Sequence, residues 1–229
     1  MPRAALLSIL GIALLGSTVL LNSRTALADE GFRVQVTITN ITRGQVISPV
    51  VVASHSAEFE PLFQLGTPAS AELAAVAEDA ILDPLIASLS GDPAVFDVQT
   101  LFGEDGPIIP GESASVIVDI KGNYRYLSMA GMLVTTNDAF FAVRGARVFA
   151  HGTSTHHSSA YDAGSEANTE NCDHIPGPPC GNAEVRVPDG SEGYVHIHAG
   201  VHGIADLVPS MHDWRNPVAE ITVTRLTGK

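Results

Sequence analysis

The sequence has little positive charge and little cysteine. Lys and Arg number 12 against 25 Asp and Glu, so the formal net charge is −13. No run of Lys or Arg occurs, which argues against nucleic acid and anionic membrane surfaces as partners and favours divalent cations. Two cysteines cannot form a disulfide framework, but they can form one bridge. Charged residues make up only 16% and hydrophobic residues 45%, a balance that excludes a disordered chain.

Sequence motifs of well-known enzymes are absent as well. The chain contains no G-x-S-x-G, H-E-x-x-H, P-loop or C-x-x-C motif. Residues 162–173 resemble an EF-hand loop, but Ala167 and Asp173 stand where such a loop needs Gly and Glu. The sequence therefore gives no support for catalysis by a known motif, and we expect a binding protein rather than an enzyme.

Residues 1–28 have the pattern of a secretory signal peptide. Arg3 supplies the positive start, residues 4–21 form an uncharged apolar run, and residues 26–28 (A-L-A) form a cleavage site. Cleavage leaves a mature domain of residues 29–229 with a charge of −15. An uncleaved membrane anchor is the alternative, because the run is long enough to cross a bilayer. We expect a secreted, periplasmic or cell-surface protein with no membrane insertion after cleavage.

The hydrophobic pattern of the mature chain predicts an all-β fold, an antiparallel sandwich with one short helix. Period-two alternation and short apolar runs predict strands over 32–40, 49–53, 95–101, 114–120, 124–134, 140–149, 194–198 and 218–226. Residues 121–123 (K-G-N) predict a hairpin turn. One helix is expected over 70–82, and Pro84 would end it. The polar segment 152–188 is expected to be a long ordered loop, a feature that usually accompanies function.

Cys172 and Cys180 lie in this long segment and enclose seven residues. In an exported protein we expect them to form a disulfide that pins the loop. Closing so short a ring contributes about 2–3 kcal/mol by loop-closure entropy. Two free thiols are the alternative.

Three acidic residues are candidates for a calcium site. Asp119 and Asp138 lie at the ends of predicted strands, and Asp162 is followed by Gly164, which lets backbone approach an ion closely. Calcium prefers several carboxylate and carbonyl oxygens that converge from loops. If strands 114–120 and 140–149 share one end of the sandwich, the three acids can meet there. The alternative is three solvated acids on the surface.

Four segments resemble the N-terminal domain of F-spondin and mindin, the spondin domain. They are S-P-V-V…A-S-H-S (48–56), M-L-V-T-T-N-D-A-F-F-A-V (132–143), Y-D-A-G-S-E (161–166) and N-P-V-A-E-I-T-V-T-R-L (216–226). The resemblance spans residues 32–226 in order. It implies an extracellular, C2-like β-sandwich that binds one calcium ion through Asp119, Asp138 and Asp162, although the family has Glu at the first of these positions.

The sequence differs from the animal spondin domains in several features. These differences weaken the expectation of the same binding partners more than the expectation of a calcium site. Animal members take part in cell–matrix adhesion and bind receptors or microbial surfaces, but here no thrombospondin repeats follow the domain. Ala139 replaces an aromatic residue, and the loop around Cys172 and Cys180 differs. A single domain behind a signal peptide resembles a bacterial exported member of the family. We therefore expect a calcium-binding adhesion or matrix-associated module whose partner is an unidentified extracellular protein or glycan surface.

A group of histidines indicates an alternative function. Residues two apart on a strand share a face, so we expect His196 and His198 on one face, with Val195 and Ile197 in the core. His202 could add a third nitrogen to a site for zinc or copper. Such a site would favour a small redox or hydrolytic metalloprotein. Exposed histidines without a metal are the other interpretation.

Overall fold

The computed structural model describes residues 31–227, so the predicted signal peptide lies outside the described residues. The strands are β1 (Phe32–Asn40), β2 (Val50–His55), β3 (Val95–Leu101), β4 (Ser113–Ile120), β5 (Tyr126–Met132), β6 (Ala139–Arg147), β7 (Thr153–Ser158), β8 (Ala160–Asp162), β9 (His196–Ile197) and β10 (Ala219–Arg225). The helices are α1 (Ala71–Asp79), α2 (Asp83–Gly91) and α3 (Pro209–His212), with a 3-10 turn η1 (Cys172–His174). Within the described range no helix is long and apolar enough to cross a membrane.

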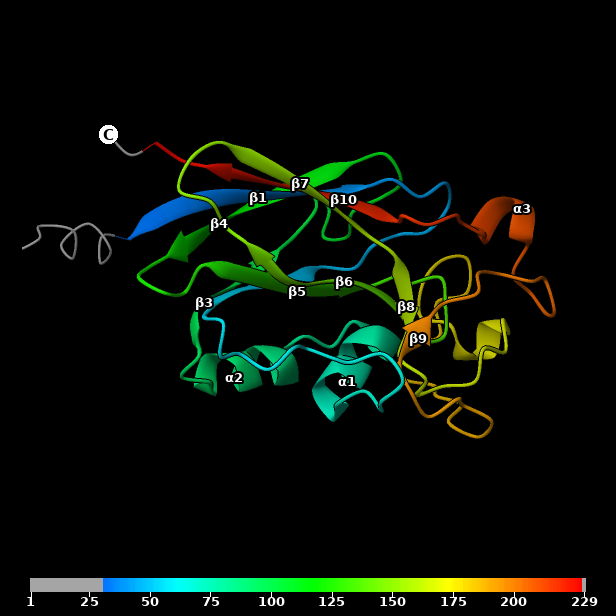
Figure 1. Ribbon diagram of the computed structural model, residues 1–229. Helices are drawn as coiled ribbons and strands as arrows, with labels where there is room; N and C mark the ends of the chain where they lie inside the picture. Colours follow the sequence, from blue (N-terminus) through cyan, green and yellow to red (C-terminus); the bar gives the residue numbers. More distant parts are fainter. Residues whose placement is uncertain (1–30, 228–229) are drawn as a thin grey trace, which may run out of the picture.

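Two antiparallel sheets pack face to face (Figure 1). The four-stranded sheet has the order β4-β1-β10-β7, and the six-stranded sheet has the order β3-β2-β5-β6-β8-β9. The predicted all-β antiparallel sandwich is thereby confirmed.

The main core lies between the two sheets. Val34, Val36 and Ile38 of β1 are fully buried, whereas the residues between them are exposed or partly exposed. They share one cluster with Phe141 of β6 and with Trp214. Burial of each large side chain contributes about 1.5–3 kcal/mol. A register shift of one residue would expose this whole row, so the alternation of β1 fixes its pairing with β4 and β10.

The helices α1 and α2 cover the outer face of the six-stranded sheet (Figure 1). One helix over 70–82 was expected, and the structure has two. Ser70 caps α1 by accepting a hydrogen bond from Leu73 N–H (3.2 Å). The helix ends where Ala80 adopts a left-handed conformation with φ of 55°. Pro84 then lies in the first turn of α2, where its missing N–H costs nothing.

The turn at 121–124 joins the two sheets. Tyr124 N–H donates to the carbonyl of Lys121 (2.9 Å), so the turn itself is as tight as predicted. The strands on either side do not pair, because β4 belongs to the four-stranded sheet and β5 to the six-stranded sheet. The predicted hairpin is therefore wrong. The alternation in β4 indicates one buried face but not which neighbour the strand takes.

The expected long loop begins later than predicted. Its first part forms β7, which pairs with β10, and β8, which pairs with β6. β7 (T-S-T-H-H-S) is an edge strand in which only Ser158 is buried. It buries no apolar residue, so the hydrophobic pattern did not mark it.

Candidate metal centre

Asp138 and Asp162 meet at one end of the six-stranded sheet. Ala139, the first residue of β6, pairs with Asp162, the last residue of β8, so Asp138 directly precedes this pair. Asp162 in turn pairs with His196 of β9. Both aspartates are fully buried, at 0% exposure. Strand pairing therefore brings together two of the three acids predicted as calcium ligands.

One carboxylate oxygen of Asp138 lacks any partner. Its Oδ2 accepts hydrogen bonds from the backbone N–H groups of Ser165 and Glu166 (2.8 and 3.0 Å). Its Oδ1 is equally buried and accepts none. Burial raises the pKa of Asp138 to about 8, with a further contribution from the negative charge of Asp162. A buried carboxylate oxygen without a partner is costly, and a bound cation would remove that cost.

Asp162 has hydrogen bonds but no Lys or Arg partner among the described residues. Its Oδ1 accepts from Gly164 N–H and its Oδ2 from the side-chain amide of Asn168, both at 2.7 Å. Burial raises the pKa of Asp162 as well. Within residues 31–227 the ion pairs of arginine belong to Arg186 and Arg215, so no Lys or Arg neutralises either aspartate.

Gly164 is needed for close approach of the chain. It has a φ of +65°, and a Cβ at this position would lie 2.3 Å from the carbonyl oxygen of Tyr194. The glycine was expected to let backbone approach an ion. In the structure it lets segments 163–166 and 192–195 approach each other, which brings Glu192 close to Asp162.

The exposed Glu192 and the half-buried His196 offer further ligand atoms beside Asp162. One oxygen or nitrogen from each of these three side chains lies within 4.8 Å of the others. Asn168 links two of them, because its amide also donates to Glu192 (3.3 Å). Nothing in the sequence marked Glu192, which lies in a polar turn far from Asp162 along the chain. The group of Asp162, Glu192 and His196, with one imidazole nitrogen, suits zinc or manganese better than calcium. The buried carboxylate oxygens of Asp138 and Asp162 suit calcium.

His198 has a structural role in the described chain. Its Nδ1 accepts from Gly200 N–H (2.9 Å), so its Nε2 carries the proton and donates to Asn168 Oδ1 (3.0 Å). Burial lowers the pKa of His198 to about 4. Both nitrogens are thus engaged, and the neutral ring packs against Trp214 with 5.0 Å between centroids.

The three predicted histidine ligands do not converge. Of the three, His196 and His198 border Asp162, with nitrogen–oxygen distances of 3.8 and 3.7 Å. His202 lies beside Glu170 instead, with its side chain 60% exposed. The predicted orientation is right for Val195, which is fully buried, but wrong for Ile197, which is 44% exposed, and for His198, which is buried. β9 has only two residues, so the period-two rule does not extend past Ile197.

Asp119 lies at the other end of the sandwich. It is near the end of β4 and pairs with Arg33 near the start of β1. Its N–H donates to Asp97 Oδ2 (2.8 Å), and its carbonyl accepts from Ser54 Oγ (2.8 Å). The strand β5 runs from the turn after β4 to the segment before Asp138, so one strand length separates the two acids (Figure 1). The structure therefore does not bring Asp119 to the site.

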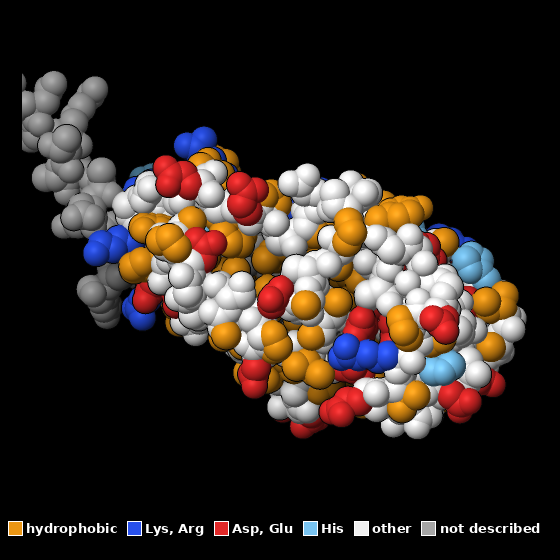
Figure 2. Space-filling model, turned by 90° about the horizontal axis from the view of Figure 1, so that it is seen from below, with side chains coloured by type: hydrophobic (Ala, Val, Ile, Leu, Met, Phe, Trp, Pro, Cys, Tyr) orange, Lys and Arg blue, Asp and Glu red, His pale blue; other side chains and the backbone are white. Residues whose placement is uncertain are grey.

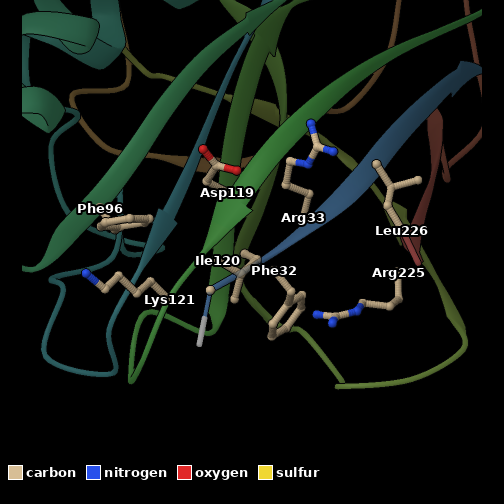
Figure 3. Close-up of a pocket in the computed structure, with 9 residues that line it drawn as sticks. Phe32, Arg33, Phe96, Asp119, Ile120, Lys121, Arg225 and Leu226 are labelled. Carbon is tan, nitrogen blue, oxygen red and sulfur yellow. The ribbon is translucent and has the colours of Figure 1, made fainter. Parts of the chain in front are cut away.

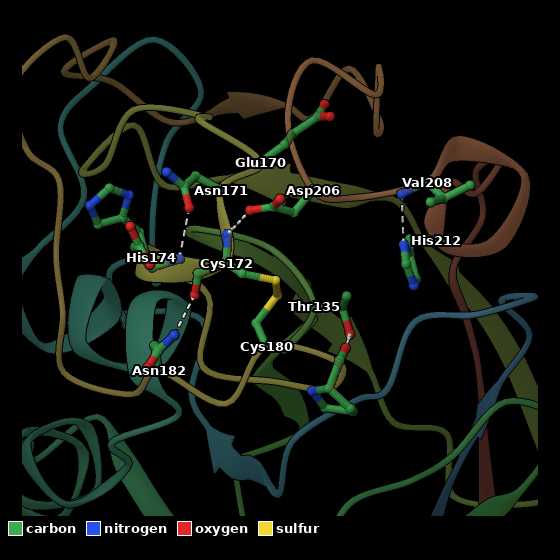
Figure 4. Close-up of a disulfide and its surroundings, with 12 residues drawn as sticks. Thr135, Glu170, Asn171, Cys172, His174, Cys180, Asn182, Asp206, Val208 and His212 are labelled. Carbon is green, nitrogen blue, oxygen red and sulfur yellow. Dashed lines mark hydrogen bonds between the residues drawn. A yellow bond between two sulfur atoms is a disulfide. The ribbon is translucent and has the colours of Figure 1, made fainter.

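The predicted disulfide Cys172–Cys180 is confirmed. Hydrogen bonds hold the bridged segment on two sides, from Cys172 N–H to Asp206 (2.9 Å) and from Asn182 to the Cys172 carbonyl (2.7 Å) (Figure 4). Thr135 donates to the carbonyl of Pro178 (2.8 Å) and so ties the bridged segment to the chain that leads into Asp138. The disulfide thus supports one wall of the candidate site.

Glu170 joins the segments on either side of η1. Its buried carboxylate accepts hydrogen bonds from the N–H groups of His202, Gly203 and Ile204 at 2.5, 2.6 and 3.0 Å. Three backbone donors around one carboxylate form a closed and satisfied group. The sequence did not mark this residue, although it fixes the loop that carries His202.

The comparisons with known proteins add no family assignment. No model of a known protein family matches the sequence, and no curated protein shows significant similarity to it.

Proposed function

We propose that this protein is an exported, calcium-binding β-sandwich of the spondin type that acts as an extracellular binding or matrix-associated module. The observation that carries the proposal is the buried Oδ1 of Asp138, which has no hydrogen-bond partner and lies beside a second buried aspartate. The spondin-like segments 132–143 and 161–166 contain both residues. The Cys172–Cys180 disulfide agrees with an oxidising compartment.

In this proposal the ion is structural. Asp138 and Asp162 would hold it, and its charge would allow both buried carboxylates to ionise. The N–H groups of Ser165 and Glu166 already fix one oxygen of Asp138, so binding would order segment 163–170 against the end of the sheet. The loops at this end would then present a fixed surface to an extracellular partner. Histidine side chains are visible at this end of the molecule, and acidic side chains are spread over the whole face (Figure 2).

Thermal unfolding of the mature protein tests the proposal. Because calcium binds only the folded site, a hundredfold excess over its dissociation constant adds about 2.7 kcal/mol. The melting temperature in calcium should exceed that in EDTA by several degrees, and Asp138→Asn and Asp162→Asn should each abolish the difference. The exposed Asp105→Asn is the matched control and should retain it. Equal melting temperatures of the wild type in calcium and EDTA would contradict the proposal.

A zinc- or copper-binding metalloprotein is the second candidate. The cluster of Asp162, Glu192 and His196 favours it, because it offers two oxygens and one nitrogen at a partly exposed position. Titration with zinc at pH 7.5 and 5.5 separates the two candidates, since imidazole binds metal only when neutral. One tight equivalent that is lost at the lower pH and in His196→Ala, but kept in His202→Ala, would support this candidate. Turnover of superoxide or an ester by the loaded protein would make it an enzyme.

A further inference from the structure

A pocket lies at the opposite end of the sandwich from the aspartate pair. It has a volume of about 460 Å³, within the usual range for small-molecule sites. Its lining comes from the start of β1, the end of β4, the end of β10 and one residue of β3 (Figure 3). None of these elements contributes to the candidate metal centre.

Positive charge gathers around this pocket. Residues 31–227 contain nine Lys and Arg in a strongly acidic chain. Three of them, Arg33, Lys121 and Arg225, line the pocket. Figure 2 shows Lys and Arg side chains at this end, and others in the opposite half of the face. No cluster is visible in the sequence, because the fold brings together residues that are far apart along the chain.

Aromatic rings lie against two of the three cations that line the pocket, Lys121 and Arg225. The guanidinium carbon of Arg225 lies 3.7 Å from the ring centroid of Phe32, and that of Arg125 lies 5.7 Å from the same centroid. Lys121 Nζ lies 6.0 Å from the ring of Phe96. A stacked guanidinium keeps its N–H groups free in the plane of the group, where they can bind a planar or tetrahedral anion.

The cations of this pocket have no acidic partner within the described chain. The ion pairs of arginine there belong to Arg186 and Arg215. Nη1 of Arg225 is buried and has no hydrogen-bond partner. Asp119 is the one acidic side chain that lines the pocket. Three cationic side chains against one carboxylate, in a pocket also lined by Phe32 and Phe96, indicate a site for an anionic group.

We propose that this pocket binds an acidic saccharide, a sugar that carries a carboxylate or a sulfate. The faces of a sugar ring are C–H groups that can lie on Phe32 or Phe96, while an acidic group at its edge can reach the arginine and lysine donors. A pocket of this volume takes one or two such rings. A long polyanion such as nucleic acid would meet the net charge of −13 over the remaining surface. The proposal uses the extracellular setting of the proposed function but not the calcium site.

Calorimetric titration of the mature chain, residues 29–229, tests this proposal. The probes are trigalacturonate and a sulfated heparin disaccharide, with the neutral cellotriose as a control. An acidic probe should bind, and its affinity should fall as salt is added. Arg33→Gln combined with Lys121→Gln changes two exposed residues and should weaken binding at least about tenfold, since two charge-assisted contacts are lost.

Three controls make the test specific to the pocket. Arg43→Gln removes an exposed arginine at the other end and should leave the affinity unchanged. Asp119→Asn removes the acidic side chain of the pocket and should raise the affinity severalfold. Asp138→Asn should leave saccharide binding intact, so failure of the calcium site is distinguishable from failure of this pocket.

Other outcomes would overturn the proposal. No binding of either acidic probe would do so, as would equal affinity for cellotriose or an equal loss in Arg43→Gln. Binding to phosphatidylglycerol vesicles without binding to the free saccharides would assign the pocket to a membrane surface instead.

Discussion

Asp138 and Asp162 lie side by side at the ends of neighbouring strands, both fully buried and without a Lys or Arg partner among the described residues. Burial and the charge of Asp162 raise the pKa of Asp138 to about 8. The metal-free fold therefore favours a proton at this site near neutral pH. A bound cation would replace this proton and favour the ionised carboxylate. The protonation state of Asp138 therefore reports whether an ion is bound.

Metal-free protein should lose stability as the pH rises. The folded pKa of Asp138 lies above its ordinary value of 3.8, so the protonated folded form is stabilised at low pH and that stability is lost as the pH rises toward about 8. Urea unfolding in EDTA at pH 5 and pH 8 should show this loss, and Asp138→Asn should show much less of it. In excess calcium the loss should disappear. A decline with pH that is the same with calcium and with EDTA would contradict the account.

His198 should give the opposite pH dependence. Burial lowers its folded pKa to about 4, so the unfolded chain binds a proton that the folded chain does not as the pH falls below about 6.5. Its contribution to stability, up to about 3 kcal/mol, is lost between pH 6.5 and pH 4. The difference in unfolding free energy between wild type and His198→Gln should shrink over this range. The control His151→Gln changes an exposed histidine, and its unfolding free energy should vary with pH as that of the wild type does. If the unfolding free energy of His198→Gln also varied in parallel with the wild type, His198 would not be buried in its neutral form.

Loss of the disulfide should act on the loop more than on the sandwich. Cys172→Ser combined with Cys180→Ser removes a short ring and should cost at most about 2–3 kcal/mol in urea unfolding. Hydrogen exchange should become faster in residues 163–182 while β1 and β10 stay protected. Calcium affinity should also fall, because Thr135 ties this segment to the chain before Asp138. Equal acceleration in β1 would show that the bridge supports the whole fold.

Local patterns predicted the parts of the fold that bury alternate apolar residues. β1 and β10 follow their predicted ranges within two residues, because each presents one apolar face to the core. β7 was missed because its side chains are polar on both faces. The helix predicted over 70–82 extends past the end of α1, because the left-handed turn at Ala80 leaves no mark in an alanine-rich segment, and α2 was not predicted.

The sequence predicted the candidate site only for residues that lie on directly paired strands. Asp138 and Asp162 were expected together and lie on paired strands. Asp119 was expected with them but lies one strand length away, because the turn at 121–124 sends β5 into the other sheet. Glu192 and Glu170 depend on contacts between loops, which no spacing along the chain predicts. The basic pocket likewise exists only after three strand ends come together.

Equilibrium dialysis of the mature protein against radioactive calcium measures how many calcium ions each chain binds. The account predicts one calcium ion per chain for the wild type and for Asp119→Asn, since Asp119 lies at the far end of the sandwich. It predicts none for Asp138→Asn or Asp162→Asn. A wild type that binds no calcium, or an Asp138→Asn variant that binds it as tightly as the wild type, would contradict the account.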